Sequence, residues 1–334
     1  DYTDQFSTNS LRDPLLALLV HEDLSGLSEA ECQLVVDSCF KSHHEKMLSP
    51  FPHYQRLLSI YQQVEQTGCQ DQFRYLSGQY KADLLVWYHL AWCGESLRRN
   101  NKVVQDLMTK GVLFSLCDRQ QLFAVIADTI AGLIPRYKAL LQRKQIEISS
   151  TPYYHPILPL LLDFKTTLDA MPYAPLPKYS KYAGGQNRAV AHVTAAKAYH
   201  QTIFNEPPRG MWPAEGGVSE AALSLMAEQG VAWAATGQSV LVNSLLKSQL
   251  SVDDKNDYLY QPYRVRKGKQ SLLSFFRDDN LSDKIGFEYA KMHTPDAVQD
   301  FIASLERIHQ ADSSDPTQAK VVSVILDGEN AWEY

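Results

Sequence analysis

The sequence is poor in the features that mark several large classes of protein. Its 32 lysines and arginines stand against 38 aspartates and glutamates, so the net charge of -6 offers no basic surplus for binding nucleic acid. No apolar run reaches the length that spans a membrane. No internal repeat of fixed period indicates a solenoid or a propeller. We therefore expect a globular protein that binds neither nucleic acid nor membrane.

Cysteine is scarce and is not arranged for metal or disulfide chemistry. The chain has five cysteines, an odd number, and no Cys-x-x-Cys motif. This pattern predicts buried thiols in a reducing compartment, and no secretory signal opens the sequence, so we expect a cytoplasmic protein. The histidines are scattered as well, and we expect neither a bound metal nor another cofactor. The sequence leaves the oligomeric state open.

Two parts of different character make up the chain. In the first part nearly every apolar pattern has helical spacing. A single apolar stripe from Leu122 to Leu141 predicts a long helix that Pro135 either kinks or divides. We expect residues 1–141 to form a mainly helical segment inserted into the domain, and residues 142–334 to form the barrel portion that carries the functional motifs.

The second part contains short apolar runs that are separated by helical patterns. The runs end near Ile148, Pro213, Thr236, Phe276 and Leu326. Strands that alternate with helices predict a parallel sheet, and polar or aromatic residues after each run favour an α/β barrel with its reactive groups at the carboxyl ends of the strands. Tyr258, Tyr260 and Tyr263 form an aromatic-rich polar segment, which either lines a glycan cleft or packs at a rim.

Two of these runs lead into a carboxylate that has a tryptophan nearby. The stretch 210–220 carries Trp212 and Glu215 just before an amphipathic helix, and the last run leads to Asp327 and Trp332. Cleavage of a glycosidic bond needs two carboxyl groups, one as nucleophile and one as acid/base. Each acid taken alone is equally compatible with a charge that caps a helix or lies on the surface.

Four segments, in this order and spacing, resemble glycoside hydrolase family 57, the group of α-amylases, amylopullulanases and 4-α-glucanotransferases. They are residues 145–156, 210–220, 276–287 and 327–332. The resemblance implies an α/β fold, an incomplete (β/α)7 barrel with a large helical insertion near the N-terminus. It also implies a retaining hydrolase or glucanotransferase that acts on α-glucans by double displacement, with Glu215 as nucleophile and Asp327 as general acid/base.

Further residues are expected to bind the substrate or to support the two acids. Glu147 and His155 match the second motif of the family, and the two tryptophans could form apolar walls. Arg277 is a candidate cation that keeps the nucleophile ionised, and Asp278 and Asp283 either bind sugar hydroxyls or brace Arg277. The expected substrate-binding set is Glu147, His155, Trp212, Arg277, Asp278 and Trp332.

The chain departs from the family pattern in two places. The first motif of the family, a His-Gln-Pro stretch on the first strand, is absent, and so is the fifth motif. We therefore expect an internal fragment of a longer catalytic domain, which lacks two strands before residue 1. Its outer strands would then be open sheet edges, and we expect residues 1–334 alone to be poorly soluble and inactive on glucans.

Three functions remain open at this point. The first is the α-glucan-active enzyme, for which the sequence does not separate hydrolysis from transfer or α-1,4 from α-1,6 specificity. The second is a metal-dependent carbohydrate deacetylase on a similar barrel, which needs a tight cluster of Asp and His that the spacing does not offer. The third is a non-catalytic glycan-binding domain, which the presence of both Glu215 and Asp327 disfavours.

Overall fold

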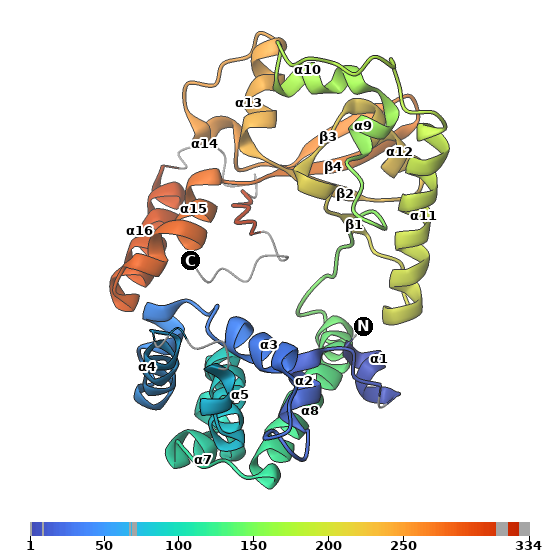
Figure 1. Ribbon diagram of the computed structural model, residues 1–334. Helices are drawn as coiled ribbons and strands as arrows, with labels where there is room; N and C mark the ends of the chain where they lie inside the picture. The colour runs from blue at the N-terminus through green and yellow to red at the C-terminus, as the bar shows by residue number, and fades with distance from the viewer. Residues whose placement is uncertain (1, 9, 67, 69–71, 312–319, 327–334) are drawn as a thin grey trace. The chain divides into compact units, whose positions relative to one another are not determined.

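The computed structural model describes residues 2–8, 10–66, 68, 72–311 and 320–326 (Figure 1). The chain divides into two compact units, one ending at Ala139 and the other beginning at Leu140. We call them the helical unit and the sheet unit and describe each by itself. Asp327 and Trp332 lie outside the described residues.

The helical unit consists of helices joined by short connections. Its elements are α1 (Tyr2–Ser7), α2 (Pro14–Leu19), α3 (Glu29–Cys39), η1 (His44–Leu48), α4 (Pro52–Gln66), η2 (Gln72–Tyr75), α5 (Gly78–Trp92), α6 (Glu95–Asn100), α7 (Lys102–Lys110) and the start of α8 (Leu116–Gln142). The capping residues explain several of these boundaries. Asp13 accepts from the first backbone N–H groups of α2, whose first residue is Pro14, and Ser28 and Glu31 form a capping box on α3.

Helix α5 lies at the centre of the helical unit, because most of its residues are buried rather than one face alone. Leu84, Leu85 and Leu90 are fully buried, and Trp87 donates from Nε1 to the carbonyl of Gly111 at 2.7 Å. Helices α2, α3 and α4 pack around α5. The core of this unit is therefore built on α5 without any strand among its described residues.

Helix α8 is continuous, so Pro135 lies inside it and does not divide it. Leu122 near its start is fully buried. Farther along the predicted apolar stripe, however, Leu133 and Tyr137 are 43% and 48% exposed. The helix is therefore longer than the part of it that the core covers.

The sheet unit contains a four-stranded sheet in the order β1-β2-β4-β3 (Figure 1). Its strands are β1 (Gly210–Met211), β2 (Trp233–Thr236), β3 (Tyr263–Lys267) and β4 (Gln270–Phe276). Strands β1, β2 and β4 are parallel, and β3 pairs with β4 in the antiparallel direction. The remaining elements are α9 (Leu158–Leu162), η3 (Phe164–Thr166), α10 (Thr167–Ala170), α11 (Gly185–Phe204), η4 (Ala214–Gly216), α12 (Glu220–Glu228), α13 (Gln238–Lys247), α14 (Lys255–Tyr258), α15 (Asp279–Asp283), η5 (Lys284–Glu288), η6 (Tyr289–Lys291) and α16 (Thr294–Gln310).

Two of the five predicted strands do not form strands in the structure. The run that ends near Ile148 is reduced to one parallel bridge between Ser150 and Met211, and the run that ends at Leu326 is reduced to one between Arg277 and Ser323. A strand needs a ladder of successive pairs, and here a single residue of each run is paired. The parallel segments still follow one another in chain order, from Ser150 through β1, β2 and β4 to Ser323.

Strand β3 was not among the predicted strands, and it begins at Tyr263, the last tyrosine of the aromatic-rich segment. It forms a hairpin with β4 in which Lys267 pairs with Gln270, and Gly268 has a φ of 59° in the turn. Three of its five residues are charged, which concealed the strand pattern. The mixed α/β class is confirmed. The sheet formed by the described residues has four strands, so the seven-stranded barrel remains a prediction.

Two apolar clusters stabilise the sheet unit. One joins α9, α11 and α12 to the strands through residues such as Leu158, Met226 and Leu272. The other joins the region of α13 and α14 to the end of β4 through Leu241, Tyr260 and Phe276. Together they fix the carboxyl ends of β1, β2 and β4, where the loops with the predicted site residues begin.

Candidate active site at the carboxyl ends of the parallel strands

Glu215 lies in a tight turn four residues after the end of β1. Its backbone has a φ of 55° and a ψ of 23°, a left-handed conformation that costs a residue with a side chain about 1 kcal/mol or more. The hydroxyl of Thr236, at the end of β2, donates to the carbonyl of Gly216 at 2.5 Å and holds this turn against the sheet. The Glu215 side chain is 66% exposed, so its carboxylate is accessible to a ligand.

Trp212 and His155 flank this turn. The backbone N–H of Trp212 donates to the carbonyl of Ser150 at 2.8 Å, and its ring lies over Gly216, where an added Cβ would be 3.5 Å from the ring. His155 has a φ of 54°, and its Nδ1 is 4.0 Å from Oε1 of Glu215. The structure therefore brings together three of the predicted site residues, from the loops that follow Ser150 and β1.

Arg277 lies directly after β4 and is not paired with Glu215. Its guanidinium binds Asp279 at 2.8 Å and Asp283 at 2.6 Å, and its Nε donates to the carbonyl of Ile325 at 2.8 Å. Burial alone would lower the pKa of Arg277, but the carboxylates of Asp283 and Asp279 outweigh it and raise the pKa. Arg277 was expected to be the cation that keeps the nucleophile ionised. This expectation is wrong, because its guanidinium pairs with Asp279 and Asp283 instead of Glu215.

Asp278 is fully buried and forms the N-cap of α15. Its carboxylate accepts from the backbone N–H of Leu281 at 3.1 Å, from the hydroxyl of Tyr260 at 2.7 Å and from Nζ of Lys255 at 3.2 Å. Burial raises the pKa of Asp278, but these donors outweigh it and lower the pKa below its ordinary value. In this geometry Asp278 holds the end of β4 and α15 in place, and it is Asp283 that braces Arg277.

The segment that precedes Asp327 is attached to the end of β4. The backbone N–H of Asp278 donates to the carbonyl of Ser323 at 2.8 Å, and the backbone N–H of Ile325 donates to the hydroxyl of Ser282 at 3.1 Å. With the bond from Arg277 to Ile325, these contacts fix the chain to within two residues of Asp327. The distance between the carboxyl groups of Glu215 and Asp327 remains a prediction.

Glu147 lies away from this group of residues. Its Oε1 accepts from Nε1 of Trp233 at 2.6 Å, and its Oε2 is 3.7 Å from Nη1 of Arg209. Trp233 is the first residue of β2, and Arg209 directly precedes β1, so Glu147 lies at the amino ends of the strands. The role of Glu147 in binding substrate remains a prediction.

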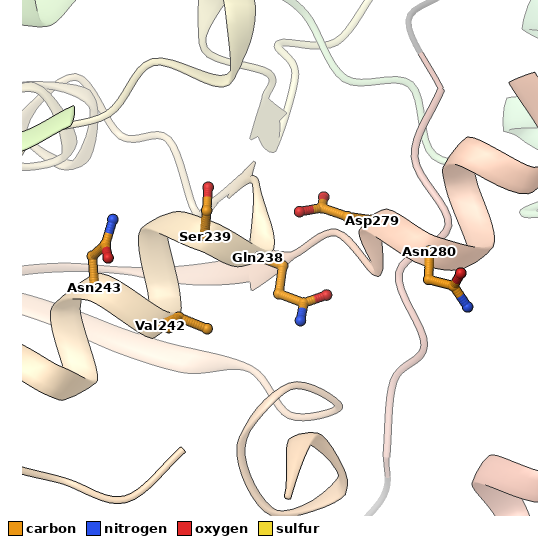
Figure 2. A pocket seen from close by; sticks show the side chains of 6 residues that line it. All are labelled: Gln238, Ser239, Val242, Asn243, Asp279 and Asn280. Carbon is orange, nitrogen blue, oxygen red and sulfur yellow. The ribbon is translucent and has the colours of Figure 1, made fainter. Parts of the chain in front are cut away.

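A pocket at the same edge of the sheet, lined mainly by polar residues, was missed by the sequence reasoning. It has a volume of about 420 Å³ and is open to solvent. Its lining comes from the beginnings of α13 and α15 and consists of Gln238, Ser239, Val242, Asn243, Asp279 and Asn280 (Figure 2). The only signal in the sequence was that polar residues directly follow two predicted strand ends, at Thr236 and Phe276.

The family of the chain follows from its sequence as a whole. The sequence model of glycosyl hydrolase family 57 matches residues 16–334. The chain therefore belongs to glycosyl hydrolase family 57, which confirms the resemblance. A search of the curated proteins finds no match.

Solved structures that resemble the chain include three larger proteins. A 4-α-glucanotransferase from Thermococcus litoralis has 19% identity and a TM-score of 0.38, over 60% of this chain and 25% of its own. An α-amylase from Thermotoga maritima has 11% identity and a TM-score of 0.38, over 83% and 43%. A family 57 branching enzyme from Thermococcus kodakaraensis has 11% identity and a TM-score of 0.44, over 90% and 61%. The chain thus spans 25% to 61% of the length of these three proteins.

Proposed function

We propose that this chain carries the catalytic acids of a retaining enzyme that cleaves or transfers α-glucosidic bonds, with Glu215 as nucleophile and Asp327 as general acid/base. The observation that carries the proposal is the placement of the two loops. The Glu215 turn is bonded to the end of β2, and the segment before Asp327 is bonded to the end of β4, its direct neighbour in the sheet. Membership of glycosyl hydrolase family 57 supports the reaction class, and the resemblance implies the α-glucan substrate.

The proposed reaction has two steps. In the first, a carboxylate oxygen of Glu215 attacks the anomeric carbon while Asp327 donates its proton to the departing glycosidic oxygen. In the second, Asp327 takes a proton from the incoming hydroxyl, which attacks the same carbon and releases Glu215. Water as the acceptor gives hydrolysis, and a sugar hydroxyl gives transfer. A retaining mechanism needs the two carboxyl groups about 5–5.5 Å apart.

The surrounding residues receive roles that follow from their contacts. His155, whose Nδ1 is 4.0 Å from Oε1 of Glu215, lies where it can contact a substrate at the nucleophile. Trp212 offers an apolar wall beside the turn. Arg277 acts on the other acid, because its bond to the carbonyl of Ile325 positions the chain that leads to Asp327. The pocket-bearing helices α13 and α15 flank the same two strands.

The kinetics of two substitutions in the full-length protein test the proposal. Glu215→Gln should reduce turnover of maltooligosaccharides by at least about 10⁴-fold, because the nucleophile is lost. Asp327→Ala should slow substrates with poor leaving groups far more than activated ones, because an activated leaving group needs little protonation. Glu228→Gln, which changes an exposed glutamate at the end of α12, is the matched control and should leave the rates unchanged. Equal losses on both substrate types would contradict the role of Asp327.

The alternative functions make different predictions. A non-catalytic glycan-binding domain would bind maltooligosaccharides but convert none, in the parent protein as in the variants. A metal-dependent deacetylase needs at least three ligands, and within the described part of the chain no group of three His, Cys, Asp or Glu side chains could hold a metal ion. The products formed from one maltooligosaccharide distinguish a hydrolase from a glucanotransferase, because chains longer than the substrate appear only if transfer occurs.

The cellular location forms part of the proposal. Cys32, Cys39 and Cys93 are buried free thiols, and Cys117 is an exposed one. Free thiols favour a reducing compartment, so we place the protein in the cytoplasm. In the part of the chain that the structure describes, no helix combines the length and the apolar character that a membrane span requires.

A further inference from the structure

The pocket between the beginnings of α13 and α15 is chemically distinct from the turn that holds Glu215. Four of its six lining side chains are neutral and polar, one is a carboxylate and one is the apolar Val242 (Figure 2). Within the described residues, the side-chain amides of Gln238, Asn243 and Asn280 have no hydrogen-bond partner from the protein. The pocket thus collects donors and acceptors that the fold itself does not use.

This chemistry restricts the class of ligand. A bound anion would meet the Asp279 carboxylate, and Arg277, which pairs with Asp279, also pairs with Asp283. A metal ion would find only one carboxylate among mostly amide and hydroxyl groups. A neutral polyol suits the lining, because each amide both donates and accepts, as vicinal hydroxyl groups do. Val242 supplies the apolar contact that the C–H face of a sugar ring prefers.

We propose that this pocket is a subsite for a glucosyl unit of the substrate, formed by Gln238, Asn243, Asp279 and Asn280. The proposal rests on the α-glucan activity proposed above and adds the position of a second sugar contact. Its volume of about 420 Å³ lies in the range of small-molecule sites. Gln238 is two residues beyond Thr236, which holds the Glu215 turn, and Asp279 is bonded to Arg277, which holds the segment before Asp327.

A sugar in this pocket would therefore contact the helices that follow β2 and β4, the two strands whose ends hold the Glu215 turn and the segment before Asp327. Gln238 and Asn243 come from the helix after β2, while Asp279 and Asn280 come from the helix after β4. Binding across the two helices would orient a glucan chain relative to the reacting bond, which is how contacts remote from the reacting atoms favour the productive geometry. The subsite would thus act on substrate binding more than on the chemical step.

Titration with glucose tests the proposal directly, because glucose has no glycosidic bond that the enzyme could cleave. Nuclear magnetic resonance of the side-chain amides follows the full-length protein as glucose is added, and Gln238→Ala, Asn243→Ala and Asn280→Ala each assign one signal by its loss. The signals of these three amides should shift together, while that of Gln201, an exposed amide on α11, stays in place. Inorganic phosphate should shift none of them. Each substitution should weaken glucose binding about tenfold, and Gln201→Ala should not.

Kinetics on maltooligosaccharides separate this proposal from the proposed function. The three pocket variants should raise KM about tenfold for chains long enough to reach the pocket and leave kcat nearly unchanged. Unmoved pocket amides in a protein that turns over maltooligosaccharides would overturn the subsite and leave the proposed function standing. Full turnover by Glu215→Gln would overturn the proposed function, while the glucose titration would still decide whether the pocket binds sugar. Equal shifts with phosphate would overturn the assignment to a neutral sugar.

Discussion

The helical unit and the sheet unit use their charged side chains in different ways. In the helical unit the buried basic side chains donate hydrogen bonds to backbone carbonyls in and next to the connections between helices. Lys81 donates to the carbonyl of Leu24 at 3.1 Å, and Arg119 donates to the carbonyls of Leu19 and His21. In the sheet unit the carboxylates after β1 and β4 lie at the carboxyl ends of parallel strands, and Glu215 is more exposed than the two that pair with Arg277 there.

Two buried carboxylates make this comparison specific. Asp83 in the helical unit accepts from the backbone N–H groups of Leu113 and Phe114, and Asp278 in the sheet unit accepts from Leu281, Tyr260 and Lys255. Both hold a connection in place through bonds that use most of the carboxylate. Glu215 differs from both, since it combines exposure with a left-handed backbone at a strand end. Burial thus identifies carboxylates that stabilise the fold, and exposure with backbone strain identifies the one proposed to react.

The largest expected effect is on the stability of the helical unit. Asp83→Ala removes the acceptor for the N–H groups of Leu113 and Phe114, and Leu113 has a φ of 59° that these bonds maintain. The buried donor of Phe114 and the partly buried donor of Leu113 would each lose a charged partner, so the free energy of unfolding of this unit should fall by about 4 kcal/mol. Hydrogen exchange followed by mass spectrometry should show faster exchange around residues 113–114. Asp106→Ala, which removes an exposed ion pair with Lys102, should change stability by no more than about 0.5 kcal/mol.

A pair of glycine substitutions should affect the two units in opposite directions. In the sheet unit a Cβ on Gly185 would lie 1.7 Å from the carbonyl oxygen of Leu161, so Gly185→Ala should force α9 and α11 apart and destabilise this unit by about 3 kcal/mol. In the helical unit a Cβ on Gly132 would meet nothing within 4 Å, so Gly132→Ala should stabilise α8 by up to about 1 kcal/mol. Denaturant unfolding measures both, and a loss of stability in both variants would contradict the difference in packing.

The smallest of these effects depends on pH and concerns Asp278. Its pKa is lower in the folded state than its ordinary value, so its contribution to stability is present above about pH 4 and is lost as the pH falls through the folded pKa. Asp278→Asn keeps the shape of the side chain but removes the charge opposite Lys255, and should cost about 2 kcal/mol at neutral pH. Unfolding measured from pH 7 downward should show parent and variant converging in acid. A constant difference between them would show that the charge of Asp278 is not responsible.

The sequence predicted the arrangement of the sheet better than its extent. The order of the parallel segments, from Ser150 to Ser323, agrees with the five predicted runs, because apolar runs that alternate with helices are typical of a parallel sheet. The sequence did not reveal that the first and last of these runs contribute only one paired residue each, Ser150 and Ser323. Strand β3 was missed because its charged residues are tolerated on an edge strand, whose register is fixed by the hairpin with β4.

Within the candidate site, the sequence indicated which loop carries each residue, but it did not indicate which side chain each residue contacts. His155, Trp212 and Glu215 belong to two separate motifs of the sequence, and the structure brings them together. The partners of Arg277 could not be predicted, because Asp278, Asp279 and Asp283 are equivalent in the sequence and only the backbone direction after β4 decides which two face the guanidinium. The position of Glu147 depends on its bond to Trp233, 86 residues away in the chain.

The central claim is that Glu215, on its strained turn, is the residue that becomes glycosylated. Mass spectrometry of full-length protein carrying Asp327→Ala tests it, after reaction with α-glucosyl fluoride, whose leaving group needs no protonation. The first step should then proceed while the second, which lacks its base, is slow, so that a covalent intermediate accumulates. We predict that the protein gains the mass of one glucosyl unit on the peptide that contains Glu215 and that Glu215→Gln abolishes the gain. A glucosyl unit on any other residue would contradict the account.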